Sequence, residues 1–291
     1  MKKSYTILHP SLFRLDGGAM FGIIPKPLWV KKTPADELNR ILLSLRVLMI
    51  KKEDKVILID SGIGDYHDKQ FNDRFAITST QSPLIGLLRE AFNLGPENIT
   101  DIILTHLHFD HVGGLGTYQN HQPQLLFPNA TIHLHRAHYQ YALNPTKRDQ
   151  GSFQKEFFLP WLELYQQQRQ IHWLEGKEGV ILPEMQINFR VSHGHTPYLV
   201  HPYDEKFIYM ADLVPTSHHV KIPWVMGYDI HPGQTTIDKE ELYPFIYQQN
   251  LTMIFEHDPK VWGAQLGSEK DEVSQLFNTN QETSWQKILA P

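Results

Sequence analysis

Short runs of aliphatic and β-branched residues recur along the whole chain, separated by polar or glycine-containing segments. Runs of this length and composition are typical of buried strands. We therefore expect strands at residues 41–50, 55–60, 101–105, 131–135, 185–191, 207–211 and 252–255. Helical periodicity is found at 82–94, where Leu84, Leu87 and Leu88 fall on one face, and at 153–168, which has an aromatic face. Strands mixed with helices over this length predict an α/β fold built from layers.

No low-complexity segment, long linker or internal repeat interrupts the sequence, so we expect a single domain over residues 1–291. Two segments between the expected elements are unusually apolar for loops. They are residues 17–30, with sequence GGAMFGIIPKPLWV, and 221–228, with sequence KIPWVMGY. Segments of this kind either pack into the core or line a ligand cleft, and the pattern alone favours neither.

Composition and charge exclude several classes of partner. The formal net charge is −5 and the basic residues are scattered, so no basic stripe is available for nucleic acid. The chain contains no cysteine, which leaves only nitrogen and oxygen ligands for any metal. No run reaches the roughly 20 apolar residues of a membrane span, and the first residues do not resemble a signal peptide. We therefore expect no membrane span and a cytoplasmic location.

The segment THLHFDHVGG, at 105–114, concentrates four candidate metal ligands directly after an apolar run. Side chains two apart on an extended strand end share a face, so His106 and His108 are placed to bind one ion. Asp110 and His111 follow where the chain turns into two glycines, and they are placed to address a second ion nearby. The density of the cluster and its position at a turn favour a functional site over isolated structural histidines.

Further candidate ligands occupy other expected strand ends. VSHGHTPY contains His193 and His195, FIYMADLVP places Asp212 after an apolar run, and MIFEHDP places His257 after another. Each of these alone would be read as structural. A site for two ions nevertheless needs more ligands than one turn can supply, and these are the residue types that bind zinc or a similar metal.

The ordered series HLHFDH, GHTP, strand-terminal Asp and strand-terminal His resembles the metallo-β-lactamase superfamily over residues 40–260. The resemblance implies an αββα four-layer sandwich with the site at the sheet edges. It implies that the first metal is bound by His106, His108 and His195 and the second by Asp110, His111 and His257, with Asp212 bridging both. Asp60 would be the buried acid that supports the site, and His193 has no role in this scheme.

The implied chemistry is hydrolysis. Two cations about 3.5–4 Å apart can share a hydroxide and polarise a substrate oxygen, and Asp110 could carry a proton to the leaving group. We expect two Zn²⁺ per chain, with iron, manganese or cobalt as alternatives. The redox branch of the superfamily has glutamate where this chain has His108, so the hydrolytic branch fits better.

The segments LDGGAMFGIIPKPLW and ADLVPTSHHVKIPWVMGYD are similar to the subgroup that contains quorum-quenching N-acyl homoserine lactone lactonases. This resemblance implies a small substrate with an apolar tail, and a homodimer is possible. The tail would contact Met20, Phe21, Ile23, Trp29, Phe109, Trp224 and Met226.

Many such lactonases have a tyrosine three residues after the bridging aspartate, where this chain has Pro215. His218 or Tyr228 is the candidate replacement, acting as an additional donor to the developing oxyanion. His219 is expected to be an exposed loop residue.

Other functions remain open at the level of sequence. The chain could be a phosphotriesterase related to methyl parathion hydrolase, a thioester hydrolase, or a metal-binding module without catalytic activity. The complete ligand set argues against the last. Turnover of a panel of lactones, a phosphotriester and a thioester would separate these classes.

Overall fold

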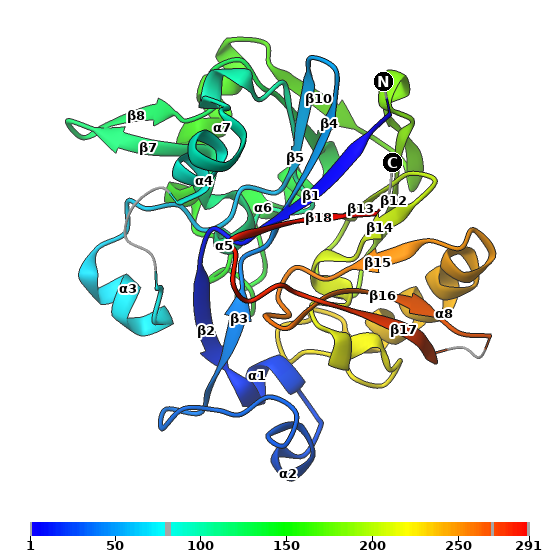
Figure 1. The fold of residues 1–291 in the computed structure, drawn as a ribbon. Coiled ribbons are helices and arrows are strands. Elements are labelled where there is room, and N and C mark those ends of the chain that lie inside the picture. The colour runs from blue at the N-terminus through cyan, green and yellow to red at the C-terminus, as the bar shows by residue number, and fades with distance from the viewer. Residues whose placement is uncertain (1, 79–82, 269–270, 290–291) are drawn as a thin grey trace.

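The computed structural model describes residues 2–78, 83–268 and 271–289. Two large mixed sheets dominate this part of the chain (Figure 1). In spatial order the first contains β10 (Ile171–Leu174), β9 (Thr131–His135), β6 (Asp101–Ile103), β5 (Lys55–Ile59), β4 (Val47–Lys52), β1 (Ser4–Leu8) and β18 (Trp285–Ile288). The second contains β11 (Glu178–Leu182), β12 (Ile187–Ser192), β13 (Leu199–Tyr203), β14 (Phe207–Tyr209), β15 (Thr252–Ile254), β16 (Val261–Leu266) and β17 (Val273–Asn278).

Two hairpins and a set of helices complete the architecture. The hairpins are β2 (Leu12–Asp16) with β3 (Arg40–Ser44), and β7 (Gly116–Gln119) with β8 (Gln122–Leu125). The α-helices are α1 (Gly17–Phe21), α2 (Lys26–Trp29), α3 (Lys69–Phe75), α4 (Pro83–Phe92), α5 (Phe109–Val112), α6 (Arg136–Leu143), α7 (Leu159–Gln167) and α8 (Pro232–Gln248). The 3₁₀ helices are η1 (Pro96–Asn98), η2 (Gly113–Leu115), η3 (Lys155–Phe157), η4 (Pro183–Met185), η5 (Ala211–Leu213) and η6 (Ser217–Val220).

The alternation of side chains along β5 shows how the layers are held together. Ile57 and Ile59 belong to the core between the two sheets, where they join residues of β14 and β15. Val56 and Leu58 point to the opposite face and pack with residues of α4 and α7. Both faces of this strand are therefore buried, which explains its nearly continuous apolar sequence. With α8 packed on β16 of the other sheet, the layers form the expected αββα sandwich.

Parallel pairing brings the ends of several strands to one edge. β5 pairs with β6 and β6 with β9 in parallel, and in the second sheet β14 pairs with β15 in parallel. The residues that follow β5, β6, β14 and β15 therefore lie at corresponding ends of their sheets. All but one of the ligands expected from sequence come directly after β6, β14 or β15, and His195 follows β12.

The structure corrects the expected strand at 41–50. Residues of this segment form two strands, β3 and β4, which belong to different sheets. Between them Arg46 is buried, and its guanidinium group donates hydrogen bonds to the backbone oxygens of Phe255 and Asp258. A continuous apolar run cannot reveal such a crossing, because both strands are equally apolar.

The expected helix at 153–168 and the expected loop at 17–30 also need correction. The first is divided at Phe158 into η3 and α7, with Pro160 in the first turn of α7. The second contains two short helices, α1 and α2. The helix expected at 82–94 corresponds to α4, although Ser82 lies outside the described residues.

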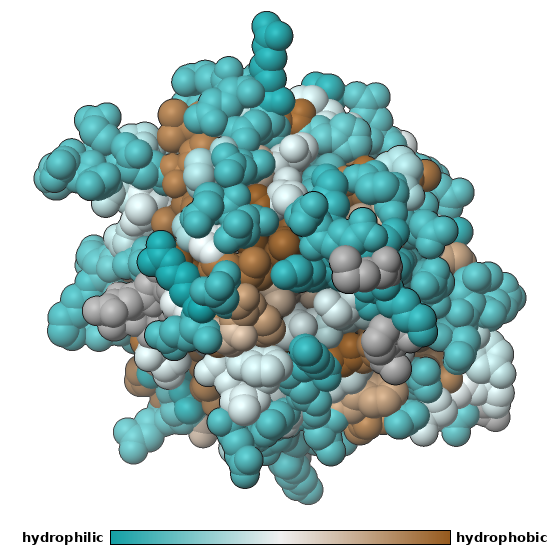
Figure 2. All heavy atoms as spheres, turned by 45° about the horizontal axis from the view of Figure 1, so that its top comes forward, coloured by the Kyte–Doolittle hydropathy of each residue, from teal (hydrophilic) through white to brown (hydrophobic). Residues whose placement is uncertain are grey.

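No helix in the described part of the chain is long and apolar enough to cross a membrane. On the face shown in Figure 2, hydrophilic residues predominate and hydrophobic ones gather in patches near the centre.

Candidate metal centre

The turn after β6 is fixed by a buried carboxylate. Asp60, directly after β5, accepts hydrogen bonds from the backbone N–H of Thr105 (2.8 Å) and from its hydroxyl (2.7 Å). His106 and His108 then precede the short helix α5, which contains Asp110 and His111. At Gly113 a Cβ atom would lie 2.2 Å from the backbone oxygen of Ile63, so only glycine allows this close approach.

Four buried residues form the first ligand group. They come from three parts of the chain and are His106, His108, His195 and Asp212, whose ligand atoms all lie within 4.8 Å of one another. Nδ1 of His108 lies 3.2 Å from Nε2 of His195, and the same Nε2 lies 3.1 Å from Oδ2 of Asp212. These atoms converge on one point, as the ligands of a single ion must.

The second group consists of Asp110, His111 and His257, again within 4.8 Å of one another. Asp212 lies between the two groups. Its Oδ1 is 3.0 Å from Nε2 of His257, whereas its Oδ2 is 3.5 Å from Nε2 of His111 and 3.1 Å from His195. One carboxylate therefore faces ligands of both groups.

Unpaired polar atoms test whether a metal fits here. Nε2 of His106 and Nε2 of His111 are buried and have no hydrogen-bond partner. Buried polar atoms are nearly always satisfied, because leaving them without a partner costs free energy. Atoms of this kind, aimed at one another and supplied by histidine beside aspartate, fit divalent metal ions.

The charge state of the imidazoles depends on their neighbours. Burial holds the pKa values of His106 and His108 well below the usual range, so both are neutral and ready to bind. Burial also opposes protonation of His195 and His257, but nearby carboxylates, chiefly Asp212, outweigh it and raise both pKa values to about 9. At His111 burial is likewise outweighed, by Glu256, Asp110 and Asp212, which hold its pKa well above the usual range. In the metal-free protein these three imidazoles therefore hold protons at neutral pH.

We predict that metal binding at pH 7 releases about three protons, from His111, His195 and His257, because an imidazole must be neutral at the nitrogen that binds. The apparent metal affinity should accordingly rise between pH 6 and pH 9. In the metal-free protein the same raised pKa values contribute stability that is fully present below about pH 6.5 and is lost as pH rises through about 9. Calorimetric titration in buffers of different ionisation enthalpy counts the protons; a pH-independent affinity would contradict this assignment.

Three acids outside the two groups support the ligands. Asp60 Oδ2 lies 3.1 Å from Nδ1 of His111, as the resemblance implied. Glu256 Oε2 lies 3.0 Å from the same nitrogen, and burial raises the pKa of this glutamic acid to about 8. Asp229 Oδ1 lies 3.0 Å from Nδ1 of His195. The sequence analysis missed Glu256 and Asp229; the only available signal was an acid next to a ligand or within an apolar loop.

The residues expected to contact a substrate tail are found in different environments. Met20, Phe21 and Trp29 are buried in a core cluster that also contains Phe109 and Met226. Phe21 stacks on Trp29, and Trp224 meets Phe21 edge to face. Ile23 is 82% exposed and turns away from this cluster. Segment 17–30 thus contributes mainly to packing. Among the expected tail contacts, Phe109 is the one that lies next to expected ligands in the sequence, between His108 and Asp110.

The candidate oxyanion donors also differ in position. His218 lines a pocket of about 240 Å³ with Arg14, Lys32 and Lys260, and none of the expected ligands lines this pocket. Tyr228 is partly buried, and burial together with the charges of Asp16 and Asp110 raises its pKa to about 12.

His219 is buried, not exposed as expected. It hydrogen-bonds Thr216 and the backbone oxygen of Met20, and its ring stacks on Phe21. His193 belongs to neither ligand group and accepts a hydrogen bond from the backbone N–H of Tyr198.

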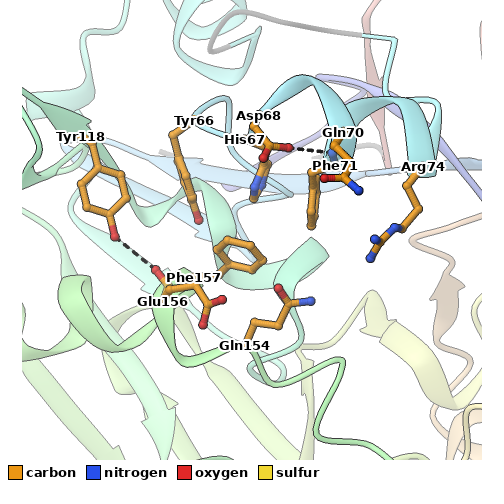
Figure 3. Close-up of a pocket in the computed structure, with 10 residues that line it drawn as sticks. All are labelled: Tyr66, His67, Asp68, Gln70, Phe71, Arg74, Tyr118, Gln154, Glu156 and Phe157. Atoms are coloured by element: carbon orange, nitrogen blue, oxygen red, sulfur yellow. Dashed lines mark hydrogen bonds between the residues drawn. The ribbon is translucent and has the colours of Figure 1, made fainter.

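An aromatic series that the sequence analysis missed extends from the metal loop. Phe75 and Phe71 of α3 pack on Phe109, with ring centroids 5.0 and 5.7 Å away. Phe71 in turn stacks on His67 at 3.9 Å and contacts Phe157. These last three residues line a pocket of about 430 Å³, with Arg74 and Glu156 among its polar side chains (Figure 3).

The layered αββα sandwich thus carries a buried cluster of histidine and aspartate side chains at its strand ends, in an arrangement that fits divalent metal ions. The sequence profile described as the metallo-beta-lactamase superfamily matches residues 46–255. This chain belongs to that superfamily.

Curated relatives include enzymes named for lactone hydrolysis. The N-acyl homoserine lactonase AttM of Agrobacterium fabrum is 25% identical over 180 residues, which are 60% of this chain and 63% of that protein. The chain thus spans less than two thirds of that relative's length. The N-acyl homoserine lactonase of Bacillus cereus is 24% identical over 239 residues, 78% of this chain and 84% of that protein.

Solved structures share the fold over almost the whole chain. A probable metal-dependent hydrolase from Staphylococcus aureus has a TM-score of 0.84 and 27% identity, covering 97% of this chain and 99% of its own. AidC, a dizinc quorum-quenching lactonase solved in complex with a product, has a TM-score of 0.73 and 19% identity, covering 96% and 95%. At that identity the second likeness shows the fold alone.

Proposed function

We propose that this protein is a dinuclear metal-dependent hydrolase that opens the ring of N-acyl homoserine lactones or related lactones. The observation that carries the proposal is the convergence of seven buried ligands in two groups, with Asp212 between them. A single tetrahedral ion binds four ligands, so seven ligands indicate a second ion. The names of the curated relatives support the choice of a lactone as substrate.

Each group has a distinct role in this proposal. His106, His108 and His195 would hold the first ion and Asp110, His111 and His257 the second, and Asp212 would bind both. Two bound ions, zinc by the nature of the ligands or otherwise iron, manganese or cobalt, would polarise the substrate carbonyl and lower the pKa of water to about 7. Asp60 and Asp229 fix ring orientations by hydrogen bonds to the remaining imidazole nitrogens.

Asp110 is the residue that we expect to move a proton. Its Oδ2 lies 3.7 Å from Nε2 of His111 and 3.6 Å from Nε2 of His257, which leaves Oδ1 available to take a proton. When the oxygen of water forms a bond with the lactone carbonyl carbon, the proton released from that water can pass to Asp110. When the ring C–O bond then breaks, the ring oxygen leaves as an alkoxide and must be protonated. A carboxylic acid beside it can supply that proton.

Tyr228 is the better candidate for the donor that replaces the missing tyrosine at Pro215. Its raised pKa keeps the hydroxyl protonated near neutral pH, so that it can donate a hydrogen bond to the developing oxyanion. Asp110 is one of the two charges that act on Tyr228, after Asp16. His218 instead lies among basic side chains in a separate pocket.

The substrate tail would leave the metal centre along Phe109. Phe109 belongs to the same apolar cluster as Met226, and Trp224 packs against that cluster. Phe71 and Phe75 contact Phe109, and Phe71 lines the pocket of Figure 3. We propose that an acyl chain lies along these rings, which are rigid and apolar.

We predict that KM falls as the acyl tail lengthens, because each buried CH₂ contributes about 0.8 kcal/mol. The reaction centre is the same for every tail, so kcat should change little. Steady-state kinetics with butanoyl to dodecanoyl homoserine lactones, alongside a phosphotriester and a thioester, measures this. Phe71→Ala should flatten the dependence, whereas Phe92→Ala, an aromatic change in α4, should preserve it.

A KM that does not change with tail length would contradict the proposal that the acyl chain lies along these rings. Faster turnover of the phosphotriester or thioester than of every lactone would replace the lactone assignment. Failure of the metal-loaded protein to hydrolyse any of these compounds would contradict the proposed function as a whole.

A further inference from the structure

The longest helix of the described chain, α8, buries polar side chains where an apolar stripe is usual. Thr235, Asp238 and Lys239 are spaced to lie on one face, and that face is turned into the protein. Buried polar groups are costly unless hydrogen-bonded, so their partners indicate what the helix does. All three bind loops that surround the metal centre.

Asp238 holds the loop that contains His195. Its Oδ2 accepts hydrogen bonds from the backbone N–H groups of His193 (2.8 Å) and Gly194 (2.7 Å). Gly194 lies so close to α8 that a Cβ atom would be 2.2 Å from the backbone nitrogen of Thr235. The residue before the metal ligand is thus pressed against the helix without a side chain between them.

Lys239 holds the segment after the bridging aspartate. Its Nζ donates hydrogen bonds to the backbone oxygens of His219 (2.8 Å) and Trp224 (2.7 Å). The side chain is fully buried, and burial lowers the pKa of its ammonium group to about 7. Helix α8 therefore holds the chain at His219 and again at Trp224, four residues before Tyr228.

Asp229 connects these loops to the ligand itself. Its Oδ1 lies 3.0 Å from Nδ1 of His195, and both side chains are almost completely buried. Its Oδ2 accepts hydrogen bonds from the hydroxyl of Thr235 (2.9 Å) and from the backbone N–H of Met226 (3.1 Å). One carboxylate thus joins a metal ligand, the polar face of α8 and the loop that carries Tyr228.

We infer that Asp229 is a positioning residue, anchored by Thr235 of α8, that orients His195 toward the metal and fixes the 226–229 loop against the same site. The effect of this positioning on substrate binding rests on the proposed lactone hydrolysis. The effect on metal binding does not, because Asp229 contacts His195 whatever the substrate.

The chemistry of the carboxylate explains why an amide cannot replace it. Asp229 receives three hydrogen bonds, and the backbone N–H of Met226 can act only as a donor. An asparagine has one accepting oxygen. If this oxygen stays with His195, the amide NH₂ faces the N–H of Met226; if it turns to Met226, His195 loses its partner. Either way one of the two functions is lost.

The test compares Asp229→Asn, Thr235→Val and Thr235→Ser with a matched control, Thr236→Val. Thr236 is the neighbouring residue of α8 and bonds only within the helix, to Gly233. Zinc affinity is measured by competition with a chromophoric chelator, the His195 site by the visible spectrum of cobalt-loaded protein, and residues 226–229 by amide hydrogen exchange. None of these measurements needs a substrate.

We expect Asp229→Asn to weaken zinc binding about 10–100-fold and to alter the cobalt spectrum. Thr235→Val should leave zinc affinity within about threefold but accelerate exchange at residues 226–229 about tenfold, since a bond to a charged group is lost. With a lactone that is turned over, Thr235→Val should raise KM more than it changes kcat. Thr235→Ser and Thr236→Val should behave like the parent protein.

Zinc affinity and exchange at residues 226–229 that are both unchanged in Asp229→Asn, or unchanged exchange in Thr235→Val, would overturn the inference. If Asp229→Asn fails to fold, hydrogen exchange at residues 226–229 in Thr235→Val and Thr235→Ser still tests the inference. Absence of lactone turnover in the parent protein would instead count against the proposed function and leave these results valid.

Discussion

Replacing Asp110 by asparagine is expected to lower kcat by about 10²–10⁴-fold, the usual contribution of a positioned proton donor. The amide has nearly the same shape, so the fold and the binding of the first ion should persist. Its oxygen can remain a weak ligand, but it cannot carry a proton at neutral pH. Steady-state kinetics and metal analysis on the same preparation separate these effects.

The matched control for this change is Asp73→Asn. Asp73 is an exposed acid of α3 that pairs with Lys69, and its conversion to amide should leave kcat unchanged. If Asp110→Asn retains parental turnover, the proposed proton transfer is wrong. Recovery of activity at high metal concentration would assign the residue a ligand role alone.

Replacing His106 by alanine is expected to remove the first metal ion and, with it, turnover. His106 is completely buried, and its Nε2 has no protein partner, so the ring is held for a ligand that the protein itself does not supply. The loss of affinity should exceed the roughly 10–100-fold that follows removal of an outer hydrogen-bonding partner. Elemental analysis after dialysis, together with kcat, measures the effect.

Thermal unfolding gives a second measure for the same variant. A metal that binds only the folded state stabilises it by about 2.7 kcal/mol when the free metal concentration is one hundred times the dissociation constant. Zinc should therefore raise the Tm of the parent protein more than that of His106→Ala. The control is His172→Ala, an exposed histidine of β10 outside both ligand groups. Equal metal content in His106→Ala and His172→Ala would contradict the assigned ligand set.

The candidate ligands could be found from the sequence because they follow short apolar runs, and the resemblance to the superfamily implied how they group; the parallel pairing that brings them together is seen only in the structure. β5 and β6 are short, apolar on both faces and parallel, so the residues after them had to meet at one edge. The density of HLHFDH then indicated a metal. The structure brings all seven expected ligands into two adjacent groups.

The supporting residues could not be predicted in the same way. Helix α8 buries threonine, aspartate and lysine on one face, so hydrophobic periodicity gives no signal for it. The role of Asp229 depends on a contact with His195, which is 34 positions away in the chain. Phe71 and Phe75 reach Phe109 only because α3 folds across the metal loop. Such contacts are set by tertiary packing and leave no local pattern.

The apolar segment 17–30 shows a further limit of pattern analysis. Its composition is equally compatible with a ligand groove and with core packing. Phe21 and Trp29 stack on each other inside the protein, while Ile23, two residues after Phe21, is largely exposed. The backbone of the short helices α1 and α2 sets which side chains point into the protein. Helices of four or five residues have too few turns to show the helical period of hydrophobic residues in the sequence.

The most direct test of the account is a zinc titration of metal-free protein, with hydrolysis of N-hexanoyl homoserine lactone measured at each step. If the protein is a dinuclear lactone hydrolase, turnover is absent without metal, rises with added zinc and reaches its plateau at two equivalents per chain. A plateau at one equivalent would contradict the dinuclear site. Full zinc loading without opening of the lactone ring would contradict the proposed reaction.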